Sequence, residues 1–196
     1  MESFGRPGGS LSNSGRRYDP GAVEGGIVGE LATAKLIEQI FATEPDVHVF
    51  HDLRIPGPAA KGAGNIDHLI VRGHTLVVVD SKRWAPGFLW TVGGHTHRGA
   101  KSFPAADKRT VGLAVDRLRQ YLTLPGAPVD AVSIRGVVLA HPAGTGHLVG
   151  FLYHPADHVD FATPANAKRV LRRLLGEPTQ PDARILRGIY GLLEAA

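Results

Sequence analysis

Two aspartates in neighbouring apolar segments are the residues best suited to joint chemistry. The segments Ile66–Arg72 and Thr75–Ser81 are rich in β-branched residues, and Gly73-His74 between them predicts a β-hairpin with a two-residue turn. Counting back from that turn places Asp67 directly opposite Asp80, with their Cβ atoms about 4.5–5.5 Å apart. Two opposed carboxylates on apolar strands repel one another. A divalent cation that prefers oxygen ligands, Mg²⁺ or Mn²⁺, would compensate both.

Two other arrangements of this pair stay open. A three-residue loop would shift the register by one and move Asp67 to the other face of its strand. Alternatively, Asp67 begins one strand and Asp80 ends the next, so that both carboxylates lie in water. In that second arrangement the pair needs no cation.

Lys82 and Glu30 are the charged residues that we expect near this pair. Lys82 follows Asp80 by two residues and therefore shares its face of the strand. Glu30 lies inside the apolar stripe of a helix predicted over Val23–Phe41, because apolar residues follow it at helical spacing. The alternatives are a plain surface lysine, and an acid in the first turn of a helix that starts near Gly26, where the helix dipole favours it.

The rest of the chain predicts an α/β fold. Further helices are expected over Pro104–Leu122, Pro164–Leu175 and Asp182–Leu193. Further strands are expected over Val47–Ile55, Leu89–Val92, Val137–Ala140 and Leu148–Tyr153. The order of these elements predicts a mixed sheet with helices packed on it.

Composition limits the classes of protein. With 196 residues, 43% of them hydrophobic, the chain can form one well-buried domain. The absence of cysteine excludes disulfides, thiolate zinc sites and cysteine nucleophiles. No apolar run approaches the roughly 20 residues that a bilayer span needs, and no secretory signal is visible, so we expect a cytoplasmic protein with no membrane partner. The net charge of +4 suits a polyanionic partner without proving one.

Basic residues predict the surface that a polyanion would contact. Those near the candidate site in sequence are Lys61, Arg83, Arg98, Lys101, Lys108 and Arg109. A second cluster, either a solvated helix face or a phosphate-binding one, consists of Lys168, Arg169, Arg172 and Arg173. Trp84 and Trp90 are expected in the core, with stacking on bases as the alternative.

Histidines do not predict a metal site. His95 and His97 are expected in an exposed hairpin loop with no third ligand nearby. Pro155 interrupts any helix that would align His154 with His158.

An acid on a helix, an acid on one strand and an Asp-x-Lys motif on the next resemble the PD-(D/E)xK nuclease superfamily. More specifically, the segment from about Val23 to Leu122 resembles the nuclease-related domain family, NERD. The matching pieces are Gly26-Ile27-Val28-Gly29-Glu30, His51-Asp52-Leu53, Asn65-Ile66-Asp67-His68-Leu69-Ile70-Val71, Val79-Asp80-Ser81-Lys82, Gly87 and Trp90. Family members often carry glutamate in place of Asp80, and often a glutamine where Asp107 and Lys108 stand.

The resemblance implies a restriction-endonuclease-like α/β fold, with a mixed central β-sheet flanked by helices. Together with the Gly-, Ser- and Arg-rich start of the chain, it predicts three parts. These are a disordered basic N-terminal arm over residues 1–20, a NERD-like nuclease core over 21–160, and a C-terminal helical extension over 161–196 packed on the core.

The resemblance also implies an enzyme that hydrolyses DNA phosphodiester bonds with Mg²⁺, or with Mn²⁺ as a substitute. Asp67 and Asp80 would bind the cation, with the Ser81 carbonyl as a further ligand, and Glu30 would act through water or complete a second site. Lys82 would orient or help deprotonate the attacking water and stabilise charge on the phosphate. The alternatives are an inactive nuclease-like module that binds DNA or a protein partner, and an interaction domain with incidental acids. A homodimer is also left open.

Overall fold

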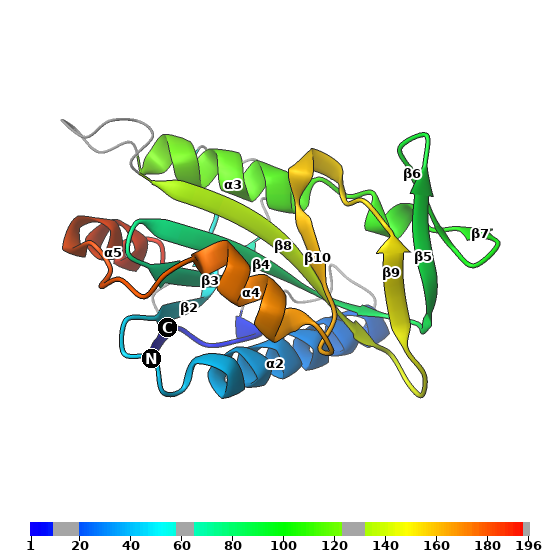
Figure 1. Ribbon diagram of the computed structural model, residues 1–196, viewed down its shortest axis with the longest axis horizontal. Coiled ribbons are helices and arrows are strands. Elements are labelled where there is room, and N and C mark those ends of the chain that lie inside the picture. The colour runs from blue at the N-terminus through cyan, green and yellow to red at the C-terminus, as the bar shows by residue number, and fades with distance from the viewer. Residues whose placement is uncertain (10–19, 58–64, 123–131, 194–196) are drawn as a thin grey trace.

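A six-stranded mixed sheet forms the centre of the fold (Figure 1). The computed structural model describes residues 1–9, 20–57, 65–122 and 132–193. In spatial order the strands are β1 (Glu2–Phe4), β2 (His48–Arg54), β3 (Asn65–Arg72), β4 (Thr75–Trp84), β8 (Ser133–Pro142) and β10 (Asp160–Ala162). The pairs β2–β3 and β3–β4 are antiparallel, whereas β1–β2, β4–β8 and β8–β10 are parallel.

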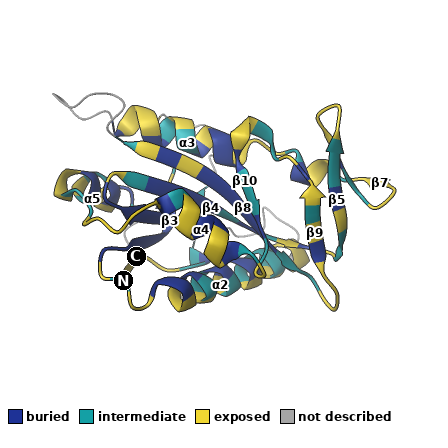
Figure 2. Ribbon diagram, viewed as in Figure 1, coloured by how far each residue is buried: buried dark blue, intermediate teal, exposed yellow. Residues whose placement is uncertain are grey.

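Helices cover both faces of this sheet. They are α2 (Pro20–Phe41), α3 (Thr110–Tyr121), α4 (Ala167–Leu175) and α5 (Ala183–Tyr190). Helices α2 and α4 contribute Ile37 and Leu171 to a core on one face, together with Val77 of β4. On the other face, Leu118 of α3 belongs to a core that includes Val78 of β4. Because successive strand residues point to opposite faces, β4 is buried on both sides (Figure 2). The predicted mixed sheet flanked by helices is therefore confirmed.

A second, four-stranded sheet stands beside one end of the central sheet, at the right of Figure 1. In spatial order it contains β7 (Lys101–Ser102), β6 (His95–Arg98), β5 (Gly87–Val92) and β9 (Leu148–Leu152). Strand β9 was predicted, but it pairs with β5 in this sheet rather than joining the central one. The strands β6, β7 and β10 were not predicted, because they are short and carry few apolar residues. No helix in the described ranges is long and apolar enough to cross a membrane.

The first nine residues are folded, which corrects the prediction of a disordered arm over residues 1–20. Residues 2–4 form β1, which pairs in parallel with His48–Phe50 of β2. The ring of Phe4 stacks on Phe50 and meets Tyr190 edge-on, each at 5.0 Å between centroids. One aromatic side chain and a short strand at a sheet edge give no periodic pattern, so the sequence does not reveal them. Residues 10–19 of the predicted arm lie outside the described residues, and Pro20 already begins α2.

The helix predicted over Pro104–Leu122 is two elements. A single 3₁₀ turn, η2 (Pro104–Ala106), is followed by an irregular link before α3 begins at Thr110. Asp107 in this link accepts a hydrogen bond from the backbone N–H of Thr96 at 3.0 Å. This contact connects β6 to the link. The chain is irregular here, where the pattern predicted a further helical turn.

The C-terminal segment completes the central sheet. The predicted boundary between residues 160 and 161 falls inside β10, and α4 follows with its apolar side in the same core as α2. A further 3₁₀ turn, η4 (Ala156–His158), leads into β10.

Arg72 of β3 links this segment to the rest of the protein. Its side chain is 3% exposed and forms ion pairs with Glu44 and Asp46, the latter at 2.8 Å. It also donates to the carbonyl oxygen of Gly176, after α4, at 3.3 Å.

We predict that Arg72→Ala lowers the free energy of unfolding by about 3 kcal/mol or more, because Asp46 loses its buried cation and Glu44 is left with the exposed Arg172. Arg172→Ala is the matched control, because Arg172 is an exposed arginine that forms an ion pair with the same Glu44, at an N–O distance of 2.5 Å. Its loss should cost less than about 1 kcal/mol. Urea unfolding followed by tryptophan fluorescence measures both variants, and equal losses would contradict the role of Arg72.

Candidate active site

The hairpin of β3 and β4 places Asp67 and Asp80 at one end of its ladder. The turn at Gly73, with φ of 55°, pairs Arg72 with Thr75, and the pairing continues to His68 with Val79. This is the register that the two-residue turn predicts. Asp67 and Asp80 come directly after the last of these pairs, where the strands are no longer joined residue to residue.

Ser81 and Lys82 tie the two aspartates together. One oxygen of Asp67 accepts a hydrogen bond from the backbone N–H of Ser81 at 2.7 Å. The ammonium of Lys82 lies 2.5 Å from Asp80 Oδ2 and 3.4 Å from the carbonyl oxygen of Ser81. Burial alone would lower the pKa of Lys82, but the charges of Asp80, Asp67 and Glu30 raise it above its usual value. Lys82 is therefore a permanent cation in this site.

Glu30 reaches the same site from α2. Its carboxylate is buried and accepts a hydrogen bond from the backbone N–H of Gly8 at 2.9 Å. Burial, together with the charges of Asp52 and Asp80, raises the pKa of Glu30 to about 7, although the Gly8 hydrogen bond and Lys82 act in the opposite direction. The glutamate is thus no first-turn surface acid.

Asp67 experiences the charges of the other three residues. Burial raises its pKa well above the usual value, and the charges of Asp80 and Glu30 raise it further. Only Lys82 and the Ser81 amide oppose this change. The structure therefore brings Glu30, Asp67, Asp80 and Lys82 together, and in the described parts of the chain the ammonium of Lys82 is the cation that acts on the three carboxylates.

Asp52 is a member of this group that we did not predict. It has a φ of 56°, which is unusual for a residue other than glycine, although it lies inside β2. The turn of the backbone there puts both Phe50 and Leu53 into the same core, whereas strict alternation would place Leu53 with His51. Asp52 accepts a hydrogen bond from Asn65 at 2.8 Å, and its charge acts on Glu30. Phe50 and Leu53 are three positions apart rather than two, and this spacing was the sign in the sequence that the strand is irregular at Asp52.

A buried chain of hydrogen bonds supports the site from behind. Ser3 meets His51 Nε2 at 3.0 Å, the Nδ1 atoms of His51 and His68 are 2.7 Å apart, and His68 Nε2 meets the Ser81 hydroxyl at 3.0 Å. Burial lowers the pKa of His51 to about 4 and that of His68 well below its usual value. Two neutral imidazoles therefore hold Ser81, whose main chain contacts Asp67 and Lys82.

The comparison with protein families agrees with this geometry. The model of the nuclease-related domain family matches residues 25–141, which is more than half of the chain. The chain belongs to the nuclease-related domain family. The family is placed in the PD-(D/E)xK-like nuclease superfamily, so the resemblance drawn from the sequence is confirmed. Searches of curated proteins and of solved structures each returned no match.

The donors of this nuclease-related domain fit Mg²⁺ in their chemistry. Among the residues that the structure describes, no three histidine, aspartate or glutamate side chains form a group that could hold a metal ion. Mg²⁺, however, is usually bound through one or two carboxylates and keeps several waters. Asp67, Asp80 and the Ser81 carbonyl are hard oxygen donors, and Asp67 is destabilised when it ionises beside Asp80 without a further cation. Glu30 does not complete a three-carboxylate cage, which agrees with a role through water.

Other candidates lie apart from the site. His97 stacks on Trp90 at 4.4 Å in the second sheet, and its neighbour His95 is exposed at the start of β6. Trp84 is buried, as predicted, with Phe103 edge-on at 5.2 Å. Lys61 lies outside the described residues.

We predict that Glu30 makes the stability of the nuclease-related domain depend on pH. Because its pKa is about 7 when folded and 4.5 ordinarily, the folded chain holds a proton that the unfolded chain releases. The stabilisation is complete below pH 4.5 and is lost as the pH rises through 7. A glutamine at this position cannot ionise. The free energy of unfolding of Glu30→Gln should therefore exceed that of the parent by up to about 3 kcal/mol as the pH rises across this range.

Urea unfolding at several pH values, with a chelator present, measures this difference. Glu38→Gln, at an exposed position of the same helix, is the control for loss of a carboxylate. Parallel pH profiles for the parent and Glu30→Gln would show that Glu30 is solvated.

Proposed function

We propose that this protein is a metal-dependent nuclease that hydrolyses DNA phosphodiester bonds. The observation that carries the proposal is the convergence of Glu30, Asp67 and Asp80 around one ammonium, that of Lys82. Membership of the nuclease-related domain family supports the same class of chemistry. The metal, the DNA substrate and the role of each residue are parts of the proposal.

Asp67 and Asp80 would hold Mg²⁺, or Mn²⁺ in its place, with the Ser81 carbonyl as a third donor. The cation would polarise a phosphoryl oxygen and lower the pKa of a bound water. The His51–His68 chain fixes Ser81, so the carbonyl donor and the amide that binds Asp67 keep their positions.

Lys82 and Glu30 have complementary roles in this proposal. Because the pKa of Lys82 is raised, Lys82 stays protonated and donates to a phosphate oxygen or to the attacking water rather than accepting a proton. Glu30 has a pKa of about 7, close to the pH at which a general base works best. We therefore assign acceptance of the proton from water to Glu30, and charge stabilisation to Lys82.

A second function is favoured by one observation. Because the family match indicates a nuclease-related domain without indicating cleavage, the site also suits an inactive nuclease-like module. Such a module would bind DNA or a protein partner without cutting. Cleavage assays separate the two functions.

We predict that Asp80→Asn and Lys82→Ala each lower the rate of DNA cleavage by about 100-fold or more, because each removes a charge that acts on the transition state. The assay uses linear, circular, single-stranded and branched DNA with Mg²⁺, Mn²⁺ or chelator. Asp116→Asn is the control, since Asp116 is exposed on α3 and pairs only with Arg119 among the ion pairs of the described residues. Correctly folded variants that cut DNA at the parental rate would refute the assignment, and a parent that binds DNA but never cuts it would favour the inactive module.

We also predict opposite effects of Asp67→Asn with and without metal. In chelator the variant should be more stable than the parent, because the repulsion from Asp80 and Glu30 is relieved. With Mn²⁺ at about 100 times its dissociation constant the parent should gain about 2.7 kcal/mol, and the variant much less. Thermal unfolding at several Mn²⁺ concentrations measures both. An equal gain in parent and variant would place the cation elsewhere.

A further inference from the structure

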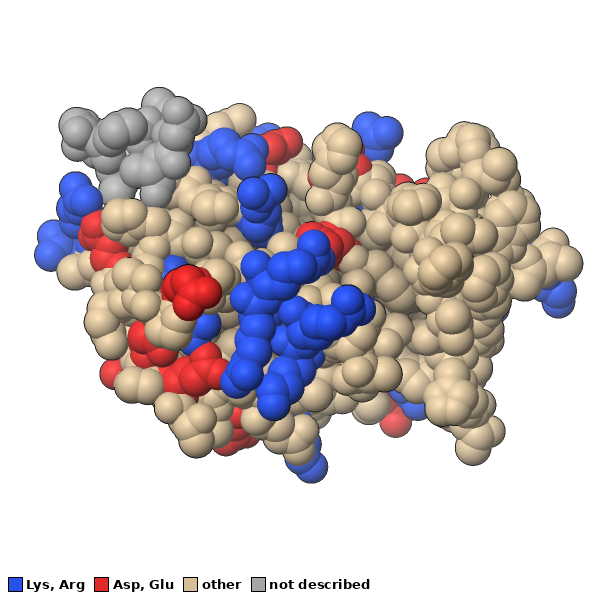
Figure 3. All heavy atoms as spheres, viewed as in Figure 1, with Lys and Arg blue, Asp and Glu red and all other residues tan. Residues whose placement is uncertain are grey.

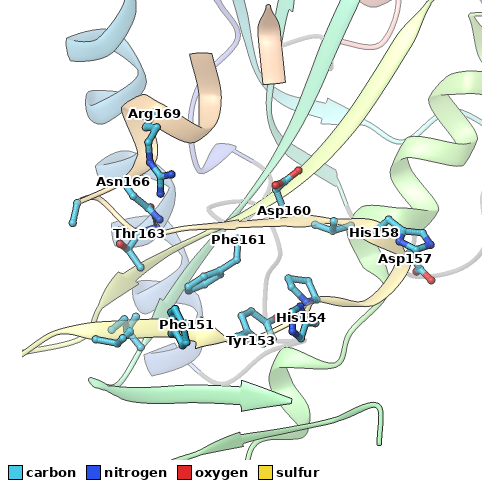
Figure 4. Close-up of a pocket in the computed structure, with 16 residues that line it drawn as sticks. Phe151, Tyr153, His154, Asp157, His158, Asp160, Phe161, Thr163, Asn166 and Arg169 are labelled. Atoms are coloured by element: carbon cyan, nitrogen blue, oxygen red, sulfur yellow. Dashed lines mark hydrogen bonds between the residues drawn. The ribbon is translucent and has the colours of Figure 1, made fainter. Parts of the chain in front are cut away.

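A long open groove lies between β9 and the segment that runs from β10 into α4 (Figure 4). Its volume is about 1030 Å³, at the upper limit of typical small-molecule pockets. Side chains from both walls point into it, among them Phe151 from β9 and Phe161 from β10. None of the residues that line it belongs to the candidate active site.

The groove has an aromatic wall that is built into the fold. Phe161 meets Tyr153 edge-on at 4.9 Å and stacks over Trp84 at 6.4 Å. Gly150 allows this packing, because a Cβ there would lie 2.4 Å from the Phe161 ring. In contrast to these packed rings, Phe151 is 81% exposed. This exposed ring, in the same groove as the packed rings, offers a flat apolar surface to a ligand.

The rim of the groove on the α4 side is basic. Helix α4 exposes four cationic residues, Lys168, Arg169, Arg172 and Arg173, and Figure 3 shows Lys and Arg side chains gathered over this helix. Arg169 lines the groove itself. In the described residues Lys168 and Arg169 form no ion pair, whereas Arg172 and Arg173 pair with Glu44 and Asp160.

The acids that line the groove do not cancel this charge. Asp160 is paired with Arg173, and Asp157 lies 3.9 Å from Arg109. The charge left over at the rim is therefore positive, which is complementary to phosphate.

One wall of the groove contacts the strand that carries Asp80 and Lys82. Trp84, which stacks on Phe161, follows Lys82 by two residues on β4 and therefore points to the same face. Burial is the main cause of the raised pKa of Tyr153, followed by the charges of Asp107 and then Asp80. A DNA chain bound in the groove would thus lie beside the strand that carries the proposed catalytic residues.

We infer that this groove binds single-stranded DNA, a proposal that rests on the nuclease function above and names its substrate more closely. Bases of a single strand present free faces that stack on Phe151, while Arg169 contacts the phosphates. In a duplex these faces are stacked inside the helix, so the bases of a duplex cannot stack on the exposed ring of Phe151. The substrate class is therefore DNA with a single-stranded tail or branch.

The test measures binding without cleavage, in Asp80→Asn protein with chelator. A fluorescein-labelled oligo-dT of about 20 nucleotides and a blunt duplex of equal length are the probes, read by fluorescence anisotropy. Phe151→Ala should weaken binding of the single strand by about 10-fold, with Phe151→Trp restoring it, because a base–aromatic stack contributes about 1–3 kcal/mol. Arg169→Gln should reduce the slope of log affinity against log salt by about 0.7. Affinity for the duplex should stay unchanged.

Two variants at exposed positions outside the groove are the controls. Leu113→Ala on α3 removes a side chain that is 52% exposed, and Arg187→Gln on α5 removes one positive charge. The proposal is overturned by any of three results: parental affinity in Phe151→Ala, stronger binding of the duplex than of the strand, or a parental dimer that Phe151→Ala makes monomeric. The last result would make the groove an interface between two copies.

The experiments distinguish failure of the groove proposal from failure of the nuclease proposal. If the parent cuts duplex DNA while the groove variants bind the single strand normally, only the groove proposal is wrong. If the groove variants lose single-strand binding while the parent cuts no DNA, the groove proposal stands and the nuclease proposal falls.

Discussion

Repulsion between carboxylates that are partly or fully buried is the constraint on which the rest of the structure depends. Asp67 and Asp80 lie side by side at the end of the β3–β4 ladder, and Glu30 approaches them from α2. One ammonium and two backbone amides are the groups that oppose their charge in the described residues. These three groups come from two parts of the chain: Lys82 and the Ser81 amide from β4, and the Gly8 amide from the N-terminal segment. The fold therefore tolerates a charge arrangement that no single element could hold.

The N-terminal segment is part of the site for this reason. Strand β1 extends the central sheet beyond β2, and the chain after it brings the Gly8 amide to Glu30. Ser3 of the same strand begins the hydrogen-bond chain through His51 and His68 that ends at Ser81. Both contacts act on groups that position the carboxylates. Loss of the segment would change the electrostatics of the site as well as the stability of a sheet edge.

The sequence predicts the centre of the site well because the centre is local. Gly73 sets the turn, the turn sets the register, and strand alternation then places Asp67, Asp80 and Lys82. Glu30 was found because a charge in an apolar helical stripe is unusual. In contrast, β1 and the second sheet depend on partners far away in sequence, and their short strands carry no periodic pattern. Asp52 was missed because its positive φ breaks the alternation that the prediction assumed.

One of the two proposed sites lies inside the range that the family model matches, and the other lies after it. The residues proposed for catalysis lie within 25–141, whereas β9, β10 and α4, which form the groove, lie after it. Metal-assisted hydrolysis needs the same few charges at the same spacing, so the residues that carry it belong to what the family model describes. Selection of a substrate needs only a surface next to that chemistry, and in our proposal that surface is formed by a strand of the second sheet, the last strand of the central sheet and the helix that follows it. The packing of Phe161 against Trp84 joins the two parts physically, because Trp84 continues the strand that carries Asp80 and Lys82. In our proposal, the residues assigned to the chemistry therefore lie within the part of the chain that the family model matches, and the residues assigned to DNA binding lie after it.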